Sequence, residues 1–383
     1  MEWKEVIATD YCYKVADGTH DSPKRQNKGR FLITSKHIKG PSIDFDNAYY
    51  ISEDDYQKII KRSKIDKWDV IVSMIGEYCG FCYLEDSDFT DYAVKNVGIL
   101  KVGERIKSLW LYYYLNSPDG RNQLKNTRAG SSQPYISLGS LRNLLIPEPP
   151  RDVMERTVSI LSSLDRKIEL NNKINANLEE MAQAIFKNWF VDFEPFKDSK
   201  LEDSELGMIP EGWKVGTLGD ITKNKSAKVK ERNDVKVLSP VTTGELVLSE
   251  EYFTKQVFSS SIAKYKIVNK GDFAYNPARV NIGSLGRNEF DFDGCVSPVY
   301  VVFSVLDGYE NYFDLFRKTD FFKDSVASLA IGGVRQSLSY DDLSSIEVII
   351  PSENAVEEFN NLYNQMKKTI KANKLENSRL STL

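Results

Sequence analysis

The sequence has few cysteines, few histidines and no long hydrophobic run, and each shortage excludes a class of protein. Crossing a membrane as a helix takes about 20 consecutive apolar residues, and no stretch of this chain approaches that length. The first residues, MEWKEVIATD, include acidic side chains and lack the apolar core of a secretory signal. We therefore expect a cytoplasmic protein that has no membrane segment.

Four cysteines in 383 residues are too few for a disulfide scaffold. Cys79 and Cys82 form a C-x-x-C pair, which is typical either of a redox centre or of half a zinc site. A zinc site needs a second pair of ligands, but the other candidates are scattered: Cys12, Cys295, His20 and His37. We interpret the cysteines as ordinary reduced thiols, interpret His20 as a polar loop residue, and expect no metal site.

The chain also lacks an excess of positive charge, since its formal net charge at pH 7 is −4. For a nucleic-acid-binding protein, the distribution of charge is more informative than its sum. Residues 222–236, TKNKSAKVKERNDVK, hold six basic and two acidic side chains. Smaller basic clusters occur in THDSPKRQNKGR (19–30) and KIIKRSKIDK (58–67). Such a cluster is usually solvated surface, but its recurrence in both halves of the chain favours a nucleic-acid partner.

What the sequence does contain is an internal repeat. ISLGSLRNLLIPEP at 136–149 returns as LSYDDLSSIEVIIP at 338–351, and the alignment continues without a gap to the end of the chain. Asn171, for example, falls on Asn373, and the apolar positions agree better than the identities do. Each copy is a strand-like run that ends in proline, followed by a long segment without glycine or proline. The order is therefore globule, long helix, globule, long helix.

The two long segments, from Arg151 to about Val191 and from Ser352 to Leu383, show the apolar spacing of helices. The apolar stripe follows the three-four spacing of a coiled-coil seam and places asparagines in or beside it. A buried asparagine in a seam lowers stability but fixes register; the alternative is that these asparagines meet water. The seam residues are Leu164, Ile168, Asn171, Asn175, Leu178, Met366, Ile370, Asn373, Asn377 and Leu380.

Four stretches carry a resemblance to a known family. They are VADGTHDSP (15–23), QPYISLGSLRNLLIPEPP (133–150), AIFKNWFVDFEPF (184–196) and LGMIPEGWKVGTLGDI (206–221). In their order, and over essentially the whole chain, they resemble the specificity subunit of a type I restriction–modification enzyme. The resemblance implies two target-recognition domains that each read half of a bipartite double-stranded DNA site, held apart by two antiparallel helices. It also implies partners, namely two modification subunits that methylate adenine with S-adenosylmethionine, and restriction (translocase) subunits.

We therefore predict an α+β protein with two mixed α/β globular recognition domains, separated by two long α-helices packed as an antiparallel coiled coil. The expected parts are a first recognition domain at 1–147, a central helix at 148–193, an acidic, loop-like linker at 194–210, a second recognition domain at 211–350 and a C-terminal helix at 351–383.

Within each recognition domain we expect basic side chains to neutralise phosphates, and amides and arginines to discriminate bases. RAGSSQPY (128–135) and GGVRQS (332–337) are attractive turns because glycine allows close backbone approach. NPARVNIGSLGR (276–287) begins like the catalytic loop of DNA amine methyltransferases but lacks its aromatic residue, so we interpret it as a DNA-contacting turn. The candidate DNA-binding residues are Lys24, Arg25, Lys28, Arg30, Arg128, Gln133, Lys223, Lys225, Lys228, Lys230, Arg279, Asn281, Arg335 and Gln336.

Three hypotheses stay open from the sequence alone. The favoured one is a non-catalytic DNA-specificity subunit, which needs no catalytic residue and no cofactor in this chain. The others are an adenine DNA methyltransferase acting alone and a helical adaptor for protein partners. The second helix stops at Leu383, whereas members of the resembled family commonly extend further. We therefore expect either a shortened C-terminus or a frame that another chain completes.

Overall fold

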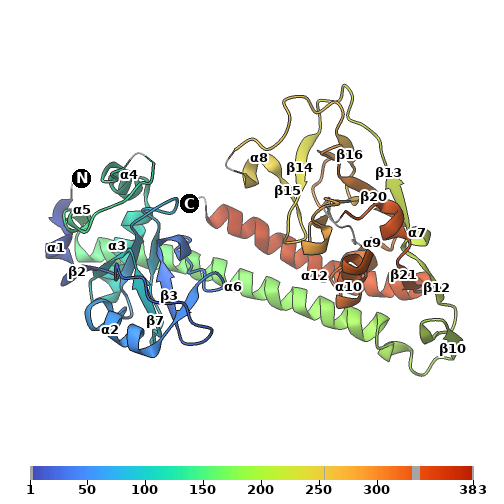
Figure 1. The fold of residues 1–383 in the computed structure, drawn as a ribbon, viewed down its shortest axis with the longest axis horizontal. Coiled ribbons are helices and arrows are strands. Elements are labelled where there is room, and N and C mark those ends of the chain that lie inside the picture. The colour runs from blue at the N-terminus through green and yellow to red at the C-terminus, as the bar shows by residue number, and fades with distance from the viewer. Residues whose placement is uncertain (1–2, 131, 254, 330–336, 382–383) are drawn as a thin grey trace. The chain divides into compact units, whose positions relative to one another are not determined.

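The computed structural model describes residues 3–130, 132–253, 255–329 and 337–381, and it divides into two compact units at residues 1–169 and 170–383 (Figure 1). Helix α6 (Arg151–Phe190) runs through this boundary, so its first half belongs to the N-terminal unit and its second half to the C-terminal unit. The predicted α+β class, with two mixed α/β domains and two long helices, is confirmed.

The N-terminal unit contains strands β1 to β9 and the short helices that precede α6. Its strands are β1 (Lys4–Ile7), β2 (Lys14–Asp17), β3 (Arg30–Thr34), β4 (Tyr49–Ile51), β5 (Val70–Ser73), β6 (Cys82–Leu84), β7 (Tyr92–Lys95), β8 (Val97–Lys101) and β9 (Leu145–Glu148). Its helices are α1 (Ala8–Tyr11), η1 (Ser35–His37), α2 (Glu53–Ser63), α3 (Arg105–Asn116), α4 (Pro118–Asn126) and α5 (Leu138–Arg142).

The C-terminal unit contains the second half of α6, strands β10 to β21 and the helices from η2 to α12. Its strands are β10 (Leu201–Ser204), β11 (Gly207–Pro210), β12 (Lys214–Thr217), β13 (Thr222–Lys225), β14 (Lys236–Pro240), β15 (Leu246–Leu248), β16 (Lys266–Val268), β17 (Phe273–Tyr275), β18 (Leu285–Arg287), β19 (Gly294–Val296), β20 (Val301–Val305) and β21 (Glu347–Ile350). Its helices are η2 (Glu194–Phe196), α7 (Leu218–Ile221), α8 (Ser249–Tyr252), η3 (Val280–Ile282), α9 (Glu310–Phe316), α10 (Asp320–Leu329), α11 (Tyr340–Ser344) and α12 (Glu353–Leu380).

The two units share one sheet topology. The order β2-β8-β5-β6 in the N-terminal unit corresponds to β13-β20-β17-β18 in the C-terminal unit, and both sheets are antiparallel. A second sheet, β4-β3-β7, corresponds to β15-β14-β19, and in each the last pair is parallel. The units differ beyond that pair, because helix α2 packs on β7 whereas strand β16 pairs with β19. The repeat therefore extends from the long helices to the whole domains.

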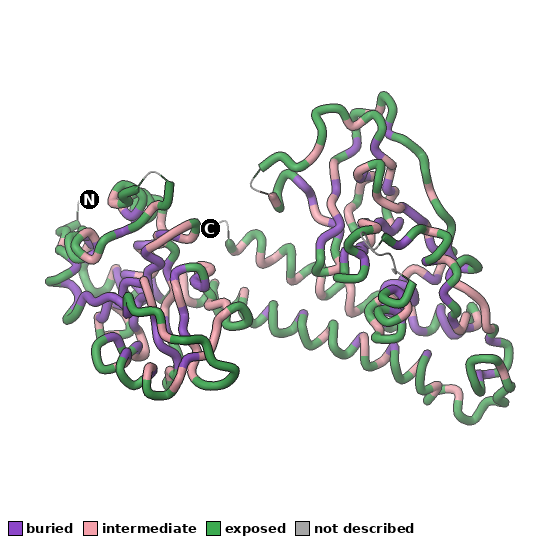
Figure 2. The backbone as a smooth tube through the Cα atoms, in the orientation of Figure 1, coloured by how far each residue is buried: buried purple, intermediate pink, exposed green. Residues whose placement is uncertain are grey.

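The core of each unit lies around the central strands of its first sheet (Figure 2). Every residue of β5 and β8 is buried, because both faces of these strands are covered. In the C-terminal unit the corresponding core is aromatic: Phe273 and Phe303 stack on neighbouring strands, and Phe313 from α9 meets both edge to face.

The same turn leads into β5 and β17. Asp69 and Asp272 are buried, and a carboxylate oxygen of each accepts a hydrogen bond from the backbone N–H three residues earlier, at 2.8 and 2.9 Å. The preceding residues, Trp68 and Gly271, both lie in the left-handed region, with φ of 72° and 88°. The turn geometry is thus kept even where glycine is replaced by tryptophan.

Substituting Gly271 tests the backbone requirement of this turn. An added Cβ would meet Arg287 Nη2 at 3.9 Å, which is ordinary contact, so any cost comes from the left-handed conformation alone. We expect Gly271→Ala to destabilise the C-terminal unit by about 1–2 kcal/mol, and Gly271→Asn to cost less, because asparagine tolerates this region better. Amide hydrogen exchange in β17 measures the difference; equal protection in both variants contradicts the expectation.

Within the C-terminal unit, the second half of α6 runs antiparallel to α12. Asn171 Nδ2 donates to Asn377 Oδ1, and Asn373 Nδ2 donates to Asn175 Oδ1, each at 2.9 Å. Asn171 and Asn175 are 1% and 6% exposed, so these amides are removed from water. Because Asn171 is the sequence counterpart of Asn373, and Asn175 that of Asn377, the crosswise pairing relates the two helices by a local two-fold symmetry.

The other seam residues are all half-buried along the two helices: Leu164, Ile168, Leu178, Met366, Ile370 and Leu380. Towards the end of α6 the contact becomes aromatic, since Phe359 of α12 lies 5.9 Å from the ring centroid of Trp189 and 5.0 Å from that of Phe190. The first part of helix α12 therefore packs against α6 through aromatic rings, and its second half is joined to α6 by hydrogen bonds between asparagine side chains.

The segment predicted as a loop-like linker is folded instead. Residues 194–210 form the short helix η2 and the antiparallel hairpin β10–β11. Phe193 and Phe196 pack edge to face on Trp213, which is 5% exposed and also contacts Phe190 at the end of α6. Its acidic composition suggested a solvated linker, but a few aromatic and apolar residues fix it to the core.

Candidate nucleic-acid interface

Three loops of the N-terminal unit converge at one end of its sheets. They are the segment after β3 (35–40), the β5–β6 loop together with the last residue of β5 (73–81), and residues 127–130 and 132–137 between α4 and α5. Ser35 Oγ accepts hydrogen bonds from the backbone N–H of Met74 and Ile75, at 3.0 and 3.2 Å. Gly76 N donates to the carbonyl of Pro134 at 2.9 Å. These contacts brace the β5–β6 loop from both sides.

The C-terminal unit builds the same loop between β17 and β18. Residues 276–284 match 73–81 in length, and the closing backbone hydrogen bond recurs, from Ser73 N to Phe81 O at 2.8 Å and from Asn276 N to Ser284 O at 3.1 Å. A glycine with positive φ sits at the same place in both, at 88° for Gly80 and 95° for Gly283. The scaffold of the loop is therefore repeated, while its side chains are not.

The structure locates most of the predicted DNA contacts at the surface. The exposed ones are Lys24, Arg25, Lys28, Arg128, Gln133, Lys223, Lys228, Lys230, Arg279 and Asn281. Arg30 and Lys225 are half-buried, and Arg335 and Gln336 lie outside the described residues. Four of the exposed residues lie on the loops described above: Arg128 and Gln133 between α4 and α5, and Arg279 and Asn281 between β17 and β18. The exposed lysines and Arg25 lie on other segments. All of them stay predictions as DNA contacts.

Two of the predicted cations already have carboxylate partners. Arg30 pairs with Glu53 at 3.0 Å and with Asp91 at 3.2 Å. Lys225 pairs with the buried Asp272 at 2.7 Å. Burial raises the pKa of the Asp272 carboxyl, and the Lys225 ammonium opposes that rise. The charge of each cation is therefore largely compensated within the protein, which weakens its case as a phosphate contact.

A basic hollow of about 740 Å³ lies in the C-terminal unit and is lined by residues 227–232. Val229 is buried, and its N–H donates to Tyr265 O at 2.9 Å, so Lys228 and Lys230 on either side remain exposed. Arg232 in the same hollow is neutralised by Asp234 and Asp293. Across the described residues, no ion pair joins Lys228, Lys230 or Glu231, so the hollow has two unpaired ammonium groups and one unpaired carboxylate.

The DGTH stretch forms a polar cluster at the junction of β7 and β8. His20 Nε2 lies 2.8 Å from Asp17 Oδ2 and His20 Nδ1 lies 3.1 Å from Asn96 Oδ1, while Arg62 also pairs with Asp17. Burial alone would raise the pKa of Asp17, but the hydrogen bonds from His20 and Arg62 hold it below its usual value. His20 is thus an exposed histidine held by neighbours.

The four cysteines are free and buried. Burial raises the pKa of the Cys82 thiol to about 12, so it stays protonated at neutral pH. Among the described residues, histidines, cysteines and carboxylates form no group of three or more that could hold a metal ion. No helix in the described part of the chain combines the length and apolarity that a bilayer span requires.

The sequence-based candidates omit the tip of the β5–β6 loop, Glu77 and Tyr78. Alignment of the turns that precede β5 and β17, KWDV (67–70) with KGDF (270–273), carries residues 73–81 onto 276–284 without a gap. That alignment places Tyr78 on Asn281, one of the predicted contacts. The alignment could therefore have indicated Tyr78 from the sequence, but only the shared backbone hydrogen bonds show that the two loops are equivalent.

Comparison with known proteins agrees with this architecture. Residues 23–180 match the family model of the type I restriction modification DNA specificity domain. The chain is 26% identical over 269 residues to the type I restriction enzyme MjaIX specificity subunit of Methanocaldococcus jannaschii, covering 67% of this chain and 62% of that one. It is 33% identical over 141 residues to the HindI specificity subunit of Haemophilus influenzae, covering 36% of this chain and 30% of that one.

A longer match extends to the putative MjaX specificity subunit of M. jannaschii, with 22% identity over 91% of this chain and 83% of that one. The chain thus spans less than two thirds of the MjaIX and HindI subunits but most of MjaX. Among solved structures, the S subunit of a type I restriction–modification system from M. genitalium superposes with a TM-score of 0.56 at 15% identity, covering 100% of this chain and 94% of that chain. That likeness establishes a shared fold.

Proposed function

We propose that this chain, whose residues 23–180 match the family model of the type I restriction modification DNA specificity domain, reads DNA for a type I restriction–modification complex. Each unit reads one half of a bipartite double-stranded site, through residues 1–147 and 211–350. The helical segments 148–193 and 351–383 set the spacing of the two half-sites and dock two modification subunits, with 194–210 as the folded connection.

In this proposal the chain itself is not catalytic and acts in the cytoplasm. S-adenosylmethionine is bound by the modification subunits, and restriction subunits join the same assembly. The Asn276–Pro277 turn supports a structural role here, because Asn276 Oδ1 accepts a hydrogen bond from the backbone N–H of Ala278 at 3.1 Å. An asparagine engaged in its own turn is poorly placed to act on a substrate amino group. A lone methyltransferase gains no support from this geometry.

One observation supports the proposal most strongly. Each unit has an equivalent loop at the same place on an equivalent sheet, but the side chains at the tips of the two loops differ. A reader of two unlike half-sites needs a constant scaffold that positions the contacts and variable groups that discriminate bases. A helical adaptor for protein partners has no need of duplicated, divergent loops. The unpaired lysines at 228 and 230 add the sequence-independent attraction to phosphates that any such reader requires.

The double substitution Lys228→Ala and Lys230→Ala tests the DNA-binding role. We expect weaker binding to every duplex alike and a salt dependence whose slope, log K against log salt, falls by roughly 0.9 for each phosphate that is no longer neutralised. Fluorescence titration of the full chain with a random duplex at several salt concentrations measures both quantities. Binding by the wild-type chain that is absent, or that does not respond to salt, contradicts the proposal.

A matched control removes two lysines of the same unit elsewhere. Lys197 and Lys200 directly precede strand β10 in the sequence. Within the C-terminal unit, Figure 1 shows β10 away from β14 and β16. Both pair with glutamates, Lys197 with Glu194 and Lys200 with Glu211. Replacing these two lysines by alanine changes the net charge of the protein by the same amount. If this control loses as much DNA affinity as the Lys228 and Lys230 double variant, the loss reflects the overall charge and not a binding site in the hollow.

A further inference from the structure

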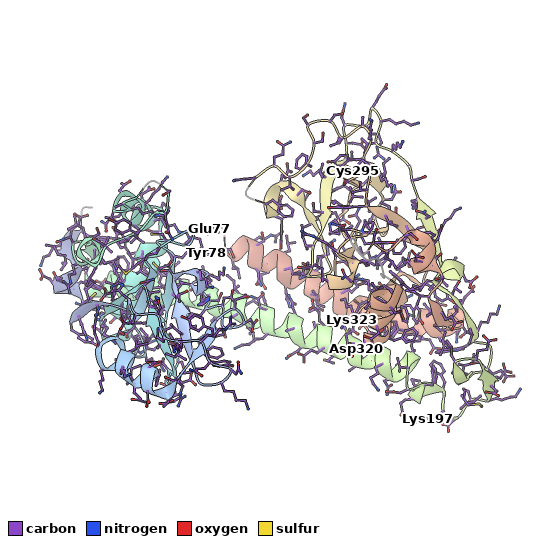
Figure 3. The ribbon with its side chains drawn as sticks, viewed as in Figure 1. Glu77, Tyr78, Lys197, Cys295, Asp320 and Lys323 are labelled. Atoms are coloured by element: carbon purple, nitrogen blue, oxygen red, sulfur yellow. The ribbon has the colours of Figure 1, made fainter. Side chains whose placement is uncertain are left out.

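We propose that the β5–β6 loop of the N-terminal unit reads a base directly, with Glu77 accepting a hydrogen bond from an exocyclic amino group in the major groove. Cytosine N4 and adenine N6 both offer such a group there. The inference rests on the proposed function, because it assigns a role to one side chain within a DNA-reading unit. Glu77 and Tyr78 lie at the rim of the N-terminal unit (Figure 3).

The chemistry of the tip is what differs between the two loops. Positions 76–79 read Gly-Glu-Tyr-Cys in the first loop, and the matching positions 279–282 read Arg-Val-Asn-Ile in the second. The backbone hydrogen bond that closes this tip is the same in both, 3.1 Å from Cys79 N to Gly76 O and 3.1 Å from Ile282 N to Arg279 O. Equal scaffolds with unlike tips are what two half-sites of different sequence require.

Glu77 is exposed at the tip, and within the described residues it makes neither a hydrogen bond nor an ion pair. Its neighbours in the cluster are positive: Lys39 lies over the ring of Tyr78, and Arg128 donates from Nη2 to the carbonyl of Cys79 at 2.5 Å. A free carboxylate on a surface that approaches phosphates lowers affinity by repulsion. The carboxylate can offset this repulsion by accepting hydrogen bonds. The donors that DNA presents in its major groove are the amino groups of cytosine and adenine.

The loop is held rigid around this carboxylate. Lys39 Nζ sits 3.8 Å from the centroid of the Tyr78 ring, and Phe81 meets the same ring edge to face at 5.5 Å. Gly76 has a φ of 86° and donates to Pro134, which ties the tip to the α4–α5 segment. A recognition group on a braced loop loses little conformational freedom on binding, so its hydrogen bond discriminates between bases more sharply.

Selection from a pool of random duplexes tests the assignment with the full chain in its complex. We expect the wild type to enrich a bipartite motif, and Glu77→Ala to lose the preference for one base at one position of one half-site, by roughly ten-fold. The other half-site should stay unchanged, while affinity for unrelated duplexes stays equal or rises, since a negative charge is removed. Arg279→Ala, at the matched tip, should alter only the opposite half-site.

A second variant distinguishes the two sources of the amino group. Glutamine both donates and accepts and pairs with adenine N6 and N7. Glu77→Gln should therefore move the preference from cytosine to adenine if the wild type reads cytosine, and should keep adenine if it reads adenine. In a duplex, guanine or thymine on one strand faces cytosine or adenine on the other, so the preference is scored by base pair. A Glu77→Gln variant that keeps a cytosine–guanine preference as strong as that of the wild type overturns the assignment.

Asp86→Asn serves as the charge-matched control. Asp86 is exposed in the segment that follows β6, at the opposite end of that strand from the β5–β6 loop. Its motif should equal that of the wild type. If Glu77→Ala also enriches the wild-type motif, Glu77 is not a reader and the inference is overturned while the proposed function stands. If the wild type enriches no bipartite motif, the proposed function itself fails.

Discussion

Replacing Phe359 by alanine is expected to destabilise the C-terminal unit by about 3–5 kcal/mol. The ring is 1% exposed and lies among the rings of Phe186, Trp189 and Phe190, with centroid separations of 6.2, 5.9 and 5.0 Å. Removing it leaves a cavity where α12 meets the end of α6, and the rigid neighbours fill such a space only partly. Urea unfolding followed by the fluorescence of Trp189 and Trp213 measures the loss.

Leu362→Ala provides the comparison on the same helix. Leu362 is 39% exposed, so its truncation removes less apolar surface and opens no enclosed cavity. We expect its cost to be well under half of that of Phe359→Ala. Equal costs for the two variants would mean that the aromatic cluster does not hold the helices together in this unit.

Replacing Arg317 by alanine is expected to cost a similar amount, about 3–5 kcal/mol, because it leaves a buried carboxylate without a partner. The side chains of Arg317 and Asp314 are 9% and 6% exposed, and they pair at 2.6 Å. The same guanidinium donates to Leu285 O at 2.8 Å and to Gly244 O at 3.1 Å. It therefore ties helix α9 to strand β18 and to the turn that precedes β15.

The pH dependence of this effect has a definite sign. Burial alone would raise the pKa of Asp314, but the positive charges of Arg317, Lys318 and Lys367 hold it well below its usual range. The wild-type pair therefore contributes stability above the unfolded-state pKa of about 4, and this contribution is lost as the pH falls. Without Arg317, burial should dominate and raise that pKa, so the cost of the substitution should be smaller at about pH 3 than at pH 7.

Denaturant unfolding of Arg317→Ala at these two pH values checks the sign. The double variant Arg317→Ala with Asp314→Asn is the control, because it removes the uncompensated charge as well as its partner. It should recover part of the lost stability at neutral pH. A double variant as unstable as the single one at neutral pH would place the cost in the missing hydrogen bonds to the two carbonyls and not in the buried charge.

The periodic parts of this protein could be predicted from the sequence. The apolar spacing predicts a helix from Arg151 to about Val191, and α6 spans Arg151–Phe190; the second, predicted from Ser352 to Leu383, appears as Glu353–Leu380. Helices of this length follow from local rules, because side chains three and four positions apart define the buried face. The prolines after the repeated strands mark where each helix can begin.

The partners of the polar residues could not be predicted in the same way. The repeat aligns Asn171 with Asn373, but in the C-terminal unit Asn171 pairs with Asn377, because antiparallel helices bring opposite ends of the repeat together. The sequence likewise suggested Arg30 and Lys225 as DNA contacts. Their carboxylate partners, Asp91 and Asp272, lie far along the chain, and spacing in the sequence carries no sign of such long-range pairs.

The sequence by itself therefore determined that two similar modules alternate with two long helices, because repeats and helical periods are local properties of the chain. Only the tertiary structure decided that residues 194–210 fold as a hairpin, that loops 73–81 and 276–284 share one scaffold, and which charges remain uncompensated. The physical reason is that burial, hydrogen-bond partners and ion pairs depend on segments remote in sequence that meet only once the sheets have formed.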